Sequence, residues 1–525
     1  MSAFAERLKR PENLAIGTVI FAAFALRLWT AHGTFLNPDE ALHFQIANQP
    51  SWSLAYRASL TTAHPPLLIF VLHFWRALGC SEFLLRLPEV LAGTIFCWLL
   101  FRWISLLFGR MAGWIALIFA AFLPPLVALS AELRQYPWLL MFMMGALLLL
   151  ERAFREQSPA DMLLAYVCVL LAMLTHYSAL LFAVALGIDS FYRWMEGKYP
   201  ARLKTAWAAG QVLVIAPFDF LYRTHLARLH SGGEITGQPW LSNSLFHRGQ
   251  QNLLVFIFAR SFGVFQFVFG QLALGDLAAI LFIVAIVYLI RGNTTRLLAL
   301  LLAIPFALTC AAAIAGKYPY GGTRHSAWLI PFAIAGVAAA ISQLTRGRAG
   351  IFVALAVVAI SAALGTPHRP YMARADQSRD NMSRAVIFLK QNAPAGSLIL
   401  TDYQSSLLVG NYLCQQQPVT FDRSLAGFLL FHCGGYRVLS TGPETSIFTA
   451  ESFLHGDTWS ILSQKLRLPW GTNFWVVQAG WDISLASQLN NASPHFRDLS
   501  VASFGRDIQI FPMILEPEGP VVPRH

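Results

Sequence analysis

Long hydrophobic runs recur along most of this 525-residue chain, from residue 14 to about residue 366. A helix needs about 20 apolar residues to cross the hydrocarbon core of a bilayer. The composition agrees with repeated crossing, because 56% of the residues are hydrophobic and only 12% are charged. The sequence therefore predicts a polytopic α-helical membrane protein.

The composition changes after residue 366, where polar residues return and apolar runs shorten to the length of strands. We predict a transmembrane body at 1–366 and a soluble domain at 367–525, whose roughly 155 residues are enough for a core of its own. Helical and strand-like patterns alternate in this tail, which favours an α/β domain. The patterned stretches are Ser383–Gln391 and Tyr403–Tyr412 for helices, and Ser397–Thr401, Phe474–Gln478 and Ile508–Phe511 for strands.

About 11 apolar spans are predicted to cross the membrane. The predicted crossings are 14–31, 87–104, 112–130, 138–151, 161–178, 179–193, 205–221, 273–290, 297–315, 326–343 and 350–366. The segment Pro65–Leu78 is also apolar, but it is short and contains His73 and Arg76. We expect this segment to lie on the membrane or re-enter it.

The distribution of basic residues orients these spans. With 65–78 not crossing, the cytoplasmic connections carry 15 Lys and Arg in 60 residues, whereas the outer ones carry 10 in 123. The positive-inside rule then places the N-terminus in the cytoplasm and the C-terminal domain outside, with large outer loops at 32–86 and 222–272. The net charge of +11 follows this topology and does not indicate a nucleic-acid partner. Arg27 and Trp29 interrupt the first apolar run, so we expect an uncleaved first helix.

Cys414 and Cys433 both fall in the C-terminal domain and have no metal-type spacing. An extracytoplasmic domain would allow them to form a disulfide. The sequence leaves their pairing open.

Two adjacent carboxylates occur in the step Asn37-Pro38-Asp39-Glu40, directly after the first hydrophobic span. Helix capping alone could explain the step, since Asn favours the cap, Pro the first turn and acids the helix N-terminus. The position at the mouth of a membrane helix, in an outer loop of about 55 residues, favours a functional site as well.

Other ionisable and aromatic groups gather at the predicted outer ends of the spans. Belt residues and snorkelling could account for each one singly. Together they indicate an interior cavity, because charged groups in membrane proteins usually face one. The groups are Arg57, His64-Pro65-Pro66-Leu67, Arg86-Leu87-Pro88, Glu132-Leu133-Arg134-Gln135-Tyr136, Thr175-His176-Tyr177, Lys317-Tyr318-Pro319-Tyr320 and Arg324-His325.

The order Asp39-Glu40, His64-Pro65-Pro66-Leu67, Ser81-Glu82-Phe83 and Arg86-Leu87-Pro88 resembles the first outer loop of GT-C membrane glycosyltransferases. The chain is similar to protein O-mannosyltransferases, lipid A aminoarabinose transferases and RgtA/B/C/D-like bacterial relatives over roughly residues 14–340. It departs from several of these at His64, where they have Lys before Pro-Pro. A phosphate contact there would be weaker or dependent on pH.

The resemblance implies a GT-C fold in a bacterial cytoplasmic (inner) membrane. It implies transfer of a sugar, usually with inversion, from a polyprenyl-phosphate donor to a hydroxyl acceptor. Asp39 would be the general base and Glu40 would orient Asp39 or the acceptor. Cations and hydrogen-bond donors would stabilise the leaving phosphate. The residues expected to bind the donor are Arg57, His64, Arg86, Arg134, Tyr136, His176, Lys317, Tyr320, Arg324 and His325, and Glu132 is expected to bind the acceptor.

We expect no cofactor and no metal. Asp39, Glu40 and His43 could share a divalent ion, but they are few ligands and no second cluster is visible. A transporter or flippase of a lipid or saccharide is the main alternative, and a scaffold that displays the tail is a weaker one. Transporters usually place ionisable sites near the bilayer midplane, whereas here the acids within spans, Asp189, Asp219 and Asp276, lie near span ends.

Overall fold

The computed structural model describes residues 11–227, 239–292, 295–365, 378–414, 428–441, 466–479, 496–498 and 500–516. The chain forms two compact units. The first, here called the helical unit, comprises Met1–Ala31, Tyr56–Leu68 and Arg86–Met372. The second, the mixed unit, comprises His32–Ala55, Ile69–Leu85 and Ala373–His525. Two pieces of the first loop thus pack with the C-terminal segment, and the boundary at residue 366 stays a prediction.

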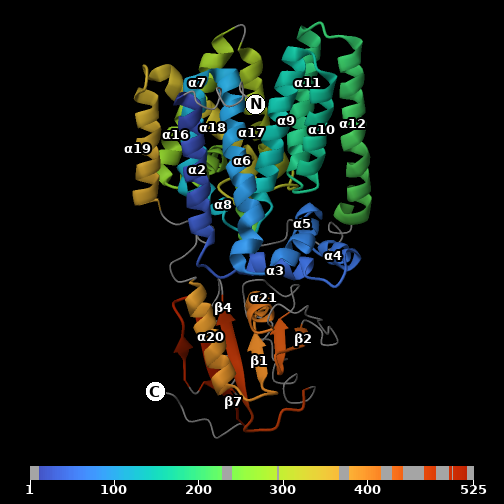
Figure 1. The fold of residues 1–525 in the computed structure, drawn as a ribbon, viewed down its shortest axis with the longest axis vertical. Coiled ribbons are helices and arrows are strands. Elements are labelled where there is room, and N and C mark those ends of the chain that lie inside the picture. The colour runs from blue at the N-terminus through green and yellow to red at the C-terminus, as the bar shows by residue number, and fades with distance from the viewer. Residues whose placement is uncertain are drawn as a thin grey trace. The chain divides into compact units, whose positions relative to one another are not determined.

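Most residues of the helical unit lie in long helices that run roughly parallel (Figure 1). Helix α10 packs against α9 and α12, and α18 packs against α7, α16 and α17. The elements are α2 (Pro11–Ala31), α6 (Glu82–Phe108), α7 (Arg110–Phe122), α8 (Pro124–Leu129), α9 (Tyr136–Glu156), α10 (Pro159–Met173), α11 (Ala179–Glu196), α12 (Ala201–Leu221), η2 (Tyr222–Leu226), α14 (Pro239–Ser242), α15 (Leu253–Phe269), α16 (Leu272–Arg291), α17 (Arg296–Ile314), η3 (Arg324–Leu329), α18 (Ile330–Leu344) and α19 (Ala349–Leu364).

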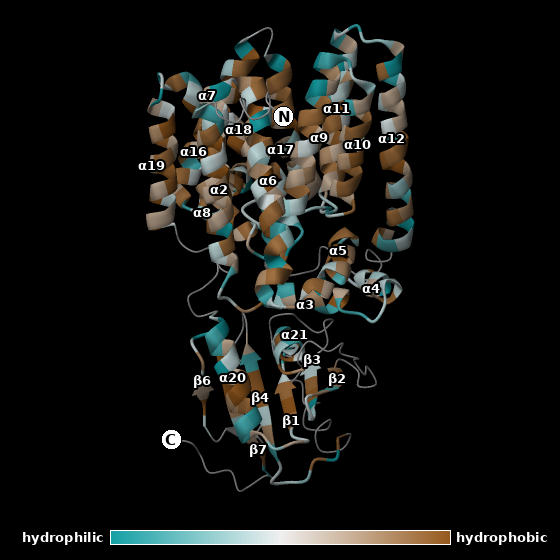
Figure 2. Ribbon diagram, in the orientation of Figure 1, coloured by the Kyte–Doolittle hydropathy of each residue, from teal (hydrophilic) through white to brown (hydrophobic). Residues whose placement is uncertain are grey.

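Among the described residues, six helices are long and apolar enough to cross a membrane. They are α2, α6, α9, α16, α17 and the continuous segment Arg324–Leu344, which is the most deeply buried. Figure 2 shows these helices as largely hydrophobic, with hydrophilic residues gathered toward their ends. The fold class predicted from the sequence is confirmed, while the number of crossings stays a prediction.

Two segments differ from their sequence-based description. Residues 222–272, expected as an outer loop, contain the helix α15, which begins after the Asn252 cap and ends at Gly270. Helix α15 was not predicted from the sequence, because Arg260 and Gln266 interrupt its apolar run. The expected span 112–130 is two helices, because Pro124 keeps Leu123 in an extended conformation between α7 and α8.

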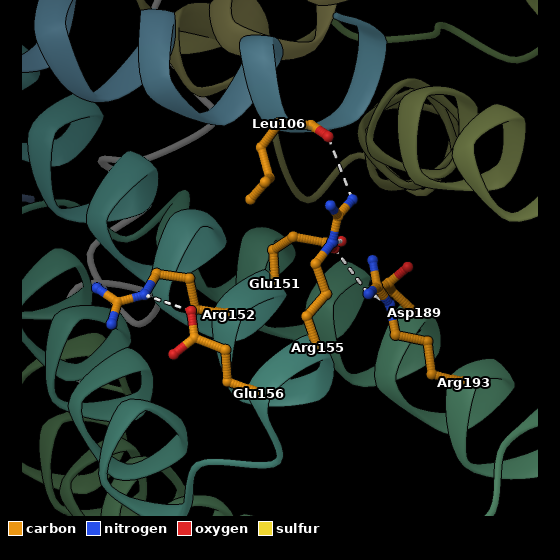
Figure 3. Close-up of polar contacts among 7 residues, drawn as sticks. All are labelled: Leu106, Glu151, Arg152, Arg155, Glu156, Asp189 and Arg193. Atoms are coloured by element: carbon orange, nitrogen blue, oxygen red, sulfur yellow. Dashed lines mark hydrogen bonds and ion pairs between the residues drawn. The ribbon is translucent and has the colours of Figure 1, made fainter.

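Charged side chains form a network near the C-terminal ends of α9 and α11 (Figure 3). Arg193 Nη1 lies 2.7 Å from Glu151 Oε2, and Arg193 Nε lies 2.8 Å from Asp189 Oδ2. Arg155 pairs with the other oxygen of Glu151 and donates to the backbone carbonyl of Leu106. Both buried carboxylates of this network, Glu151 and Asp189, therefore have a cationic partner, as burial of charge requires.

Replacing Arg193 with Leu should lower the free energy of unfolding by about 3–5 kcal/mol, because two buried carboxylates lose their shared partner. Equilibrium unfolding in detergent measures this change. The matched control is Arg223→Leu, whose pair with Asp219 is mostly exposed and should contribute at most about 1 kcal/mol. Equal losses for the two variants would contradict the prediction.

The mixed unit combines two pieces of the first loop, His32–Ala55 and Ile69–Leu85, with an α/β domain (Figure 1). Between α2 and α6 the chain forms α3 (Pro38–Ala47), α4 (Trp52–Ser59), α5 (Leu67–Trp75) and η1 (Arg76–Leu78). The later elements are α20 (Arg379–Asn392), β1 (Leu398–Thr401), α21 (Tyr403–Tyr412), β2 (Phe428–Cys433), β3 (Tyr436–Thr441), β4 (Asn473–Ala479), β5 (Phe496–Asp498), β6 (Ala502–Ser503) and β7 (Ile508–Leu515). The α/β character predicted for the tail is confirmed.

The described strands form one mixed sheet in the order β2-β3-β1-β4-β7-β5, with β6 beside β7. Strand β1 runs parallel to β3 and β4, and the other pairs are antiparallel. Leu400, Leu439, Val476 and Met513 contribute to the core on the central strands. A disulfide joins Cys414, just past α21, to Cys433 at the end of β2, which answers the question that the sequence left open.

Candidate active site

The step Asn37-Pro38-Asp39-Glu40 forms the N-terminus of α3 in the mixed unit. Asn37 is the N-cap, and its side-chain oxygen accepts from the Glu40 backbone N–H at 3.0 Å. Glu40 Oε2 accepts in return from the Asn37 backbone N–H at 2.8 Å. This reciprocal pair is a capping box, so the capping explanation is correct for Asn37 and Glu40.

Asp39 takes no part in the capping box. Its side chain is half-buried, and Glu40, Ala41 and His43 around it are buried. The His43 ring nitrogen Nδ1 lies 2.7 Å from the Asp39 backbone oxygen, which ties the ring to the first turn. The carboxylate of Asp39 thus lies at the positive end of a helix whose start is fixed by its neighbours. The catalytic roles expected for Asp39 and Glu40 stay predictions.

A second group of predicted residues lies together in the helical unit, around His176 in the turn between α10 and α11. The His176 ring centroid is 5.4 Å from that of Tyr136 and 6.3 Å from that of His64. The Arg134 guanidinium lies 5.8 Å from the centre of the Tyr136 ring. Arg134 and Arg324 are both buried and close enough to act on the charge of His176. We call these five residues the cationic cluster.

Burial lowers the pKa of His176 to about 3, and the positive charges of Arg134 and Arg324 add to the effect. The His176 imidazole is therefore neutral near pH 7 and can offer a hydrogen bond but no charge. Its Nδ1 contacts the Ser178 hydroxyl at 2.8 Å. Near pH 7 the positive charge next to His176 thus comes from Arg134 and Arg324.

His176 should make folding stability depend on pH. An unfolded histidine has a pKa near 6.5. Below that pH the unfolded state binds a proton that folded His176 excludes, so the free energy of unfolding decreases as the pH is lowered. The loss should approach about 2 kcal/mol between pH 6.5 and 5 at 1.4 kcal/mol per unit. In His176→Gln the free energy of unfolding should depend less on pH across this range than in the wild type. The control His32→Gln changes an exposed histidine and should keep the pH dependence of the wild type. A full slope in His176→Gln would be the contrary result.

Three residues to which the sequence assigned no binding role complete the surroundings of the cluster. The Gln135 side-chain nitrogen lies 3.0 Å from His64 Nδ1, Ser178 contacts His176, and Tyr318 is close to Tyr136 and Ser178. Gln135 and Tyr318 lie within motifs named above and Ser178 directly follows one, but nothing in their residue types indicated that they would face the same place.

Tyr320 is buried, and its hydroxyl contacts the Ser261 hydroxyl on α15 at 2.8 Å. The chain next to it approaches α15 closely, since a Cβ on Gly322 would lie 2.7 Å from the Gly263 carbonyl oxygen. Helix α15, absent from the sequence analysis, therefore supports the segment that carries Tyr320 and Arg324.

The remaining predicted site residues have other surroundings. Arg86 is buried and donates to the Ala31 carbonyl at 3.0 Å, at the end of α2. The backbone oxygen of His325 accepts from the Tyr318 hydroxyl. Glu132 is half-buried in the turn before α9, and Arg57 and Lys317 are exposed. Within the described residues, no group of three or more His, Cys, Asp or Glu side chains is arranged to hold a metal ion.

Residues 63–221 match the family model described as dolichyl-phosphate-mannose-protein mannosyltransferase. No curated protein sequence matches the chain. The matched segment includes four members of the cationic cluster, His64, Arg134, Tyr136 and His176. The matched segment and the fold are both similar to those of GT-C membrane glycosyltransferases, which are integral membrane proteins, and this confirms the resemblance noted in the sequence.

Solved structures with the same fold include ArnT from Cupriavidus metallidurans bound to undecaprenyl phosphate. Its TM-score is 0.55 at 12% identity, over 95% of this chain and 97% of that one. The archaeal oligosaccharyltransferase AglB from Archaeoglobus fulgidus, in complex with an inhibitory peptide and a dolichol-phosphate, gives 0.52 at 10%, over 94% and 73%. The Archaeoglobus fulgidus oligosaccharyltransferase in complex with Zn and sulfate gives 0.52 at 11%, over 95% and 73%. At these identities the likeness concerns the fold.

Proposed function

We propose that the protein transfers a sugar from a polyprenyl-phosphate-linked donor to a hydroxyl acceptor at the extracytoplasmic face of a bacterial inner membrane. The observation that carries this proposal is the cationic cluster, in which the buried Arg134 and Arg324 lie near His176, whose imidazole is neutral. The undecaprenyl phosphate and dolichol-phosphate bound by ArnT and AglB support a donor of this kind.

The cluster suits an anionic leaving group. Buried guanidinium groups stabilise phosphate oxygens far better than water does, because they are already oriented when charge develops. The Tyr136 hydroxyl is buried and has no hydrogen-bond partner among the described residues. A buried polar group of this kind needs an explanation, and a phosphate oxygen of the donor would supply its partner.

The remaining expected donor contacts belong to the same proposal, in which they bind the phosphate or its lipid. They are Arg57, His64, Arg86, Lys317, Tyr320 and His325. Glu132 is proposed to bind the acceptor. The exposed positions of Arg57 and Lys317 favour roles in attracting the donor headgroup rather than in direct contact with a buried phosphate.

Asp39 is proposed as the general base. Its carboxylate takes the proton of the acceptor hydroxyl while the oxygen forms a bond to the anomeric carbon. The bond between that carbon and the phosphate oxygen breaks on the opposite side, so the configuration inverts and polyprenyl phosphate leaves. Glu40, through the capping box, holds the turn that presents Asp39.

The extracytoplasmic placement rests on two arguments. The positive-inside bias puts the C-terminal domain outside. The Cys414–Cys433 disulfide supports the same side, because disulfides persist in oxidising compartments such as the periplasm and are rare in the cytosol.

A transporter or flippase remains the alternative. A transporter would use ionisable groups near the bilayer midplane. The buried acids Glu151 and Asp189 are instead paired with arginines toward the ends of α9 and α11, which favours a structural role. No metal is required by the proposed chemistry, since the two arginines supply the charge that a divalent ion would.

The test is transfer by the purified protein from a panel of polyprenyl-phosphate sugars, each carrying a labelled sugar, to hydroxyl acceptors. We expect the label in the acceptor and release of polyprenyl phosphate. A parallel arm measures movement of lipid or saccharide across liposomes that contain the protein. Transport without transfer over the whole panel would replace the enzyme proposal with the transporter.

A further inference from the structure

Helix α21 of the C-terminal domain packs against α3, although the two lie far apart in the sequence. Both helices belong to the mixed unit. The Gln45 side chain donates to the Leu407 carbonyl at 2.8 Å. The rings of Phe35 and Tyr412 meet edge to face at 6.4 Å. The helix that carries Asp39 is therefore built partly on the C-terminal domain.

The Tyr412 hydroxyl, at the last residue of α21, bonds on two sides. It accepts from the Leu36 backbone N–H at 2.7 Å and donates to Glu82 Oε1 at 3.0 Å. Leu36 directly precedes the Asn37 cap, and Glu82 is the first residue of α6. Tyr412 thus links the peptide before the carboxylate turn to the start of a long helix.

Neighbouring contacts hold the same strip of chain. The Arg379 backbone N–H donates to the Gly33 carbonyl at 2.8 Å, and the Arg379 guanidinium lies 3.5 Å from Glu82 Oε2. Thr34 forms an isolated bridge with Ser378. These contacts fix residues 33 and 34, and in the described part of the chain the Leu36 N–H bonds to the Tyr412 hydroxyl.

We propose that Tyr412 is a positioning residue, through which the C-terminal domain sets the turn that presents Asp39. This inference rests on the proposed function of Asp39. Without the hydroxyl, the Leu36 N–H and the buried Glu82 carboxylate each lose a partner, a state that the segment can relieve only by moving. A displacement of about 1 Å at a reacting group can cost 100-fold in rate.

The experiment compares Tyr412→Phe with the wild-type full-length protein in the transfer assay. We expect kcat to fall by about 10- to 100-fold, with the KM for the donor changed less than about twofold, because the proposed phosphate contacts lie in the helical unit. The matched control is Tyr436→Phe, which removes another buried hydroxyl of the same domain, one that donates to the Ala393 carbonyl. That variant should keep kcat within about twofold.

Hydrogen exchange gives a readout independent of turnover. The Leu36 amide should exchange faster in Tyr412→Phe than in the wild type, and at the wild-type rate in Tyr436→Phe. An active wild type with unchanged kcat in Tyr412→Phe, or with unchanged Leu36 exchange, overturns the positioning role alone. A wild type that transfers no sugar overturns the proposed function and this role with it.

Discussion

Replacing Asp39 with Asn should reduce sugar transfer by about 10²- to 10⁴-fold, the usual contribution of a general base. Asn has nearly the same shape, but it cannot accept the acceptor's proton. The helix should still form, because the Asn37–Glu40 capping box does not involve the Asp39 side chain. Loss of a negative charge from the first turn should cost only about 0.3–1 kcal/mol of stability.

Initial rates at saturating donor, measured with thermal unfolding of the same samples, separate catalysis from folding. Asp380→Asn is the matched control, because Asp380 also lies in the first turn of a helix of the mixed unit and its side chain is 76% exposed. That variant should keep wild-type turnover. Turnover of Asp39→Asn within about threefold of wild type would exclude Asp39 as the base.

Arg324→Ala should lower kcat/KM for the donor by about 10²- to 10³-fold, the effect of removing one preorganised partner of a developing anion. Arg324 is buried beside His176, which is neutral and cannot replace the lost charge. Arg324→Lys should lose less, because it retains the charge but not the fork of donors that binds phosphate.

Steady-state kinetics and equilibrium binding of polyprenyl phosphate check this prediction together. Arg223→Ala is the control, since the Arg223 side chain is 75% exposed and pairs with Asp219. Both readouts should stay near wild type in the control. Unchanged kinetics in Arg324→Ala would remove Arg324 from the donor site.

Much of the candidate site could be predicted because charge is rare in this chain. Arg134, His176 and Arg324 stood out at the ends of apolar spans, and the structure brings them together. Two other cations predicted by the same rule have different surroundings. Lys317 is exposed, and Arg86 bonds to a helix end, because a cation at a span end can equally meet solvent or an unpaired carbonyl.

Three uncharged residues were given no role from the sequence, for the opposite reason. Gln135, Ser178 and Ser261 have types that occur anywhere, and only the fold shows which neighbours they meet. Helix α15 was missed because polar residues interrupt its apolar run, and β2 and β3 because short strands give weak patterns.

By itself, the sequence determined that the chain enters a membrane, that a polar α/β segment follows, and that Asn37 to Glu40 begin a helix. Each of these follows from local composition, since hydrophobic length and capping preferences act over a few turns. Only the tertiary structure decided that α21 supports α3 and that Tyr412 bonds to Leu36. The bond between Tyr412 and Leu36 joins residues 376 positions apart. Such contacts depend on how whole elements pack, which no local pattern encodes.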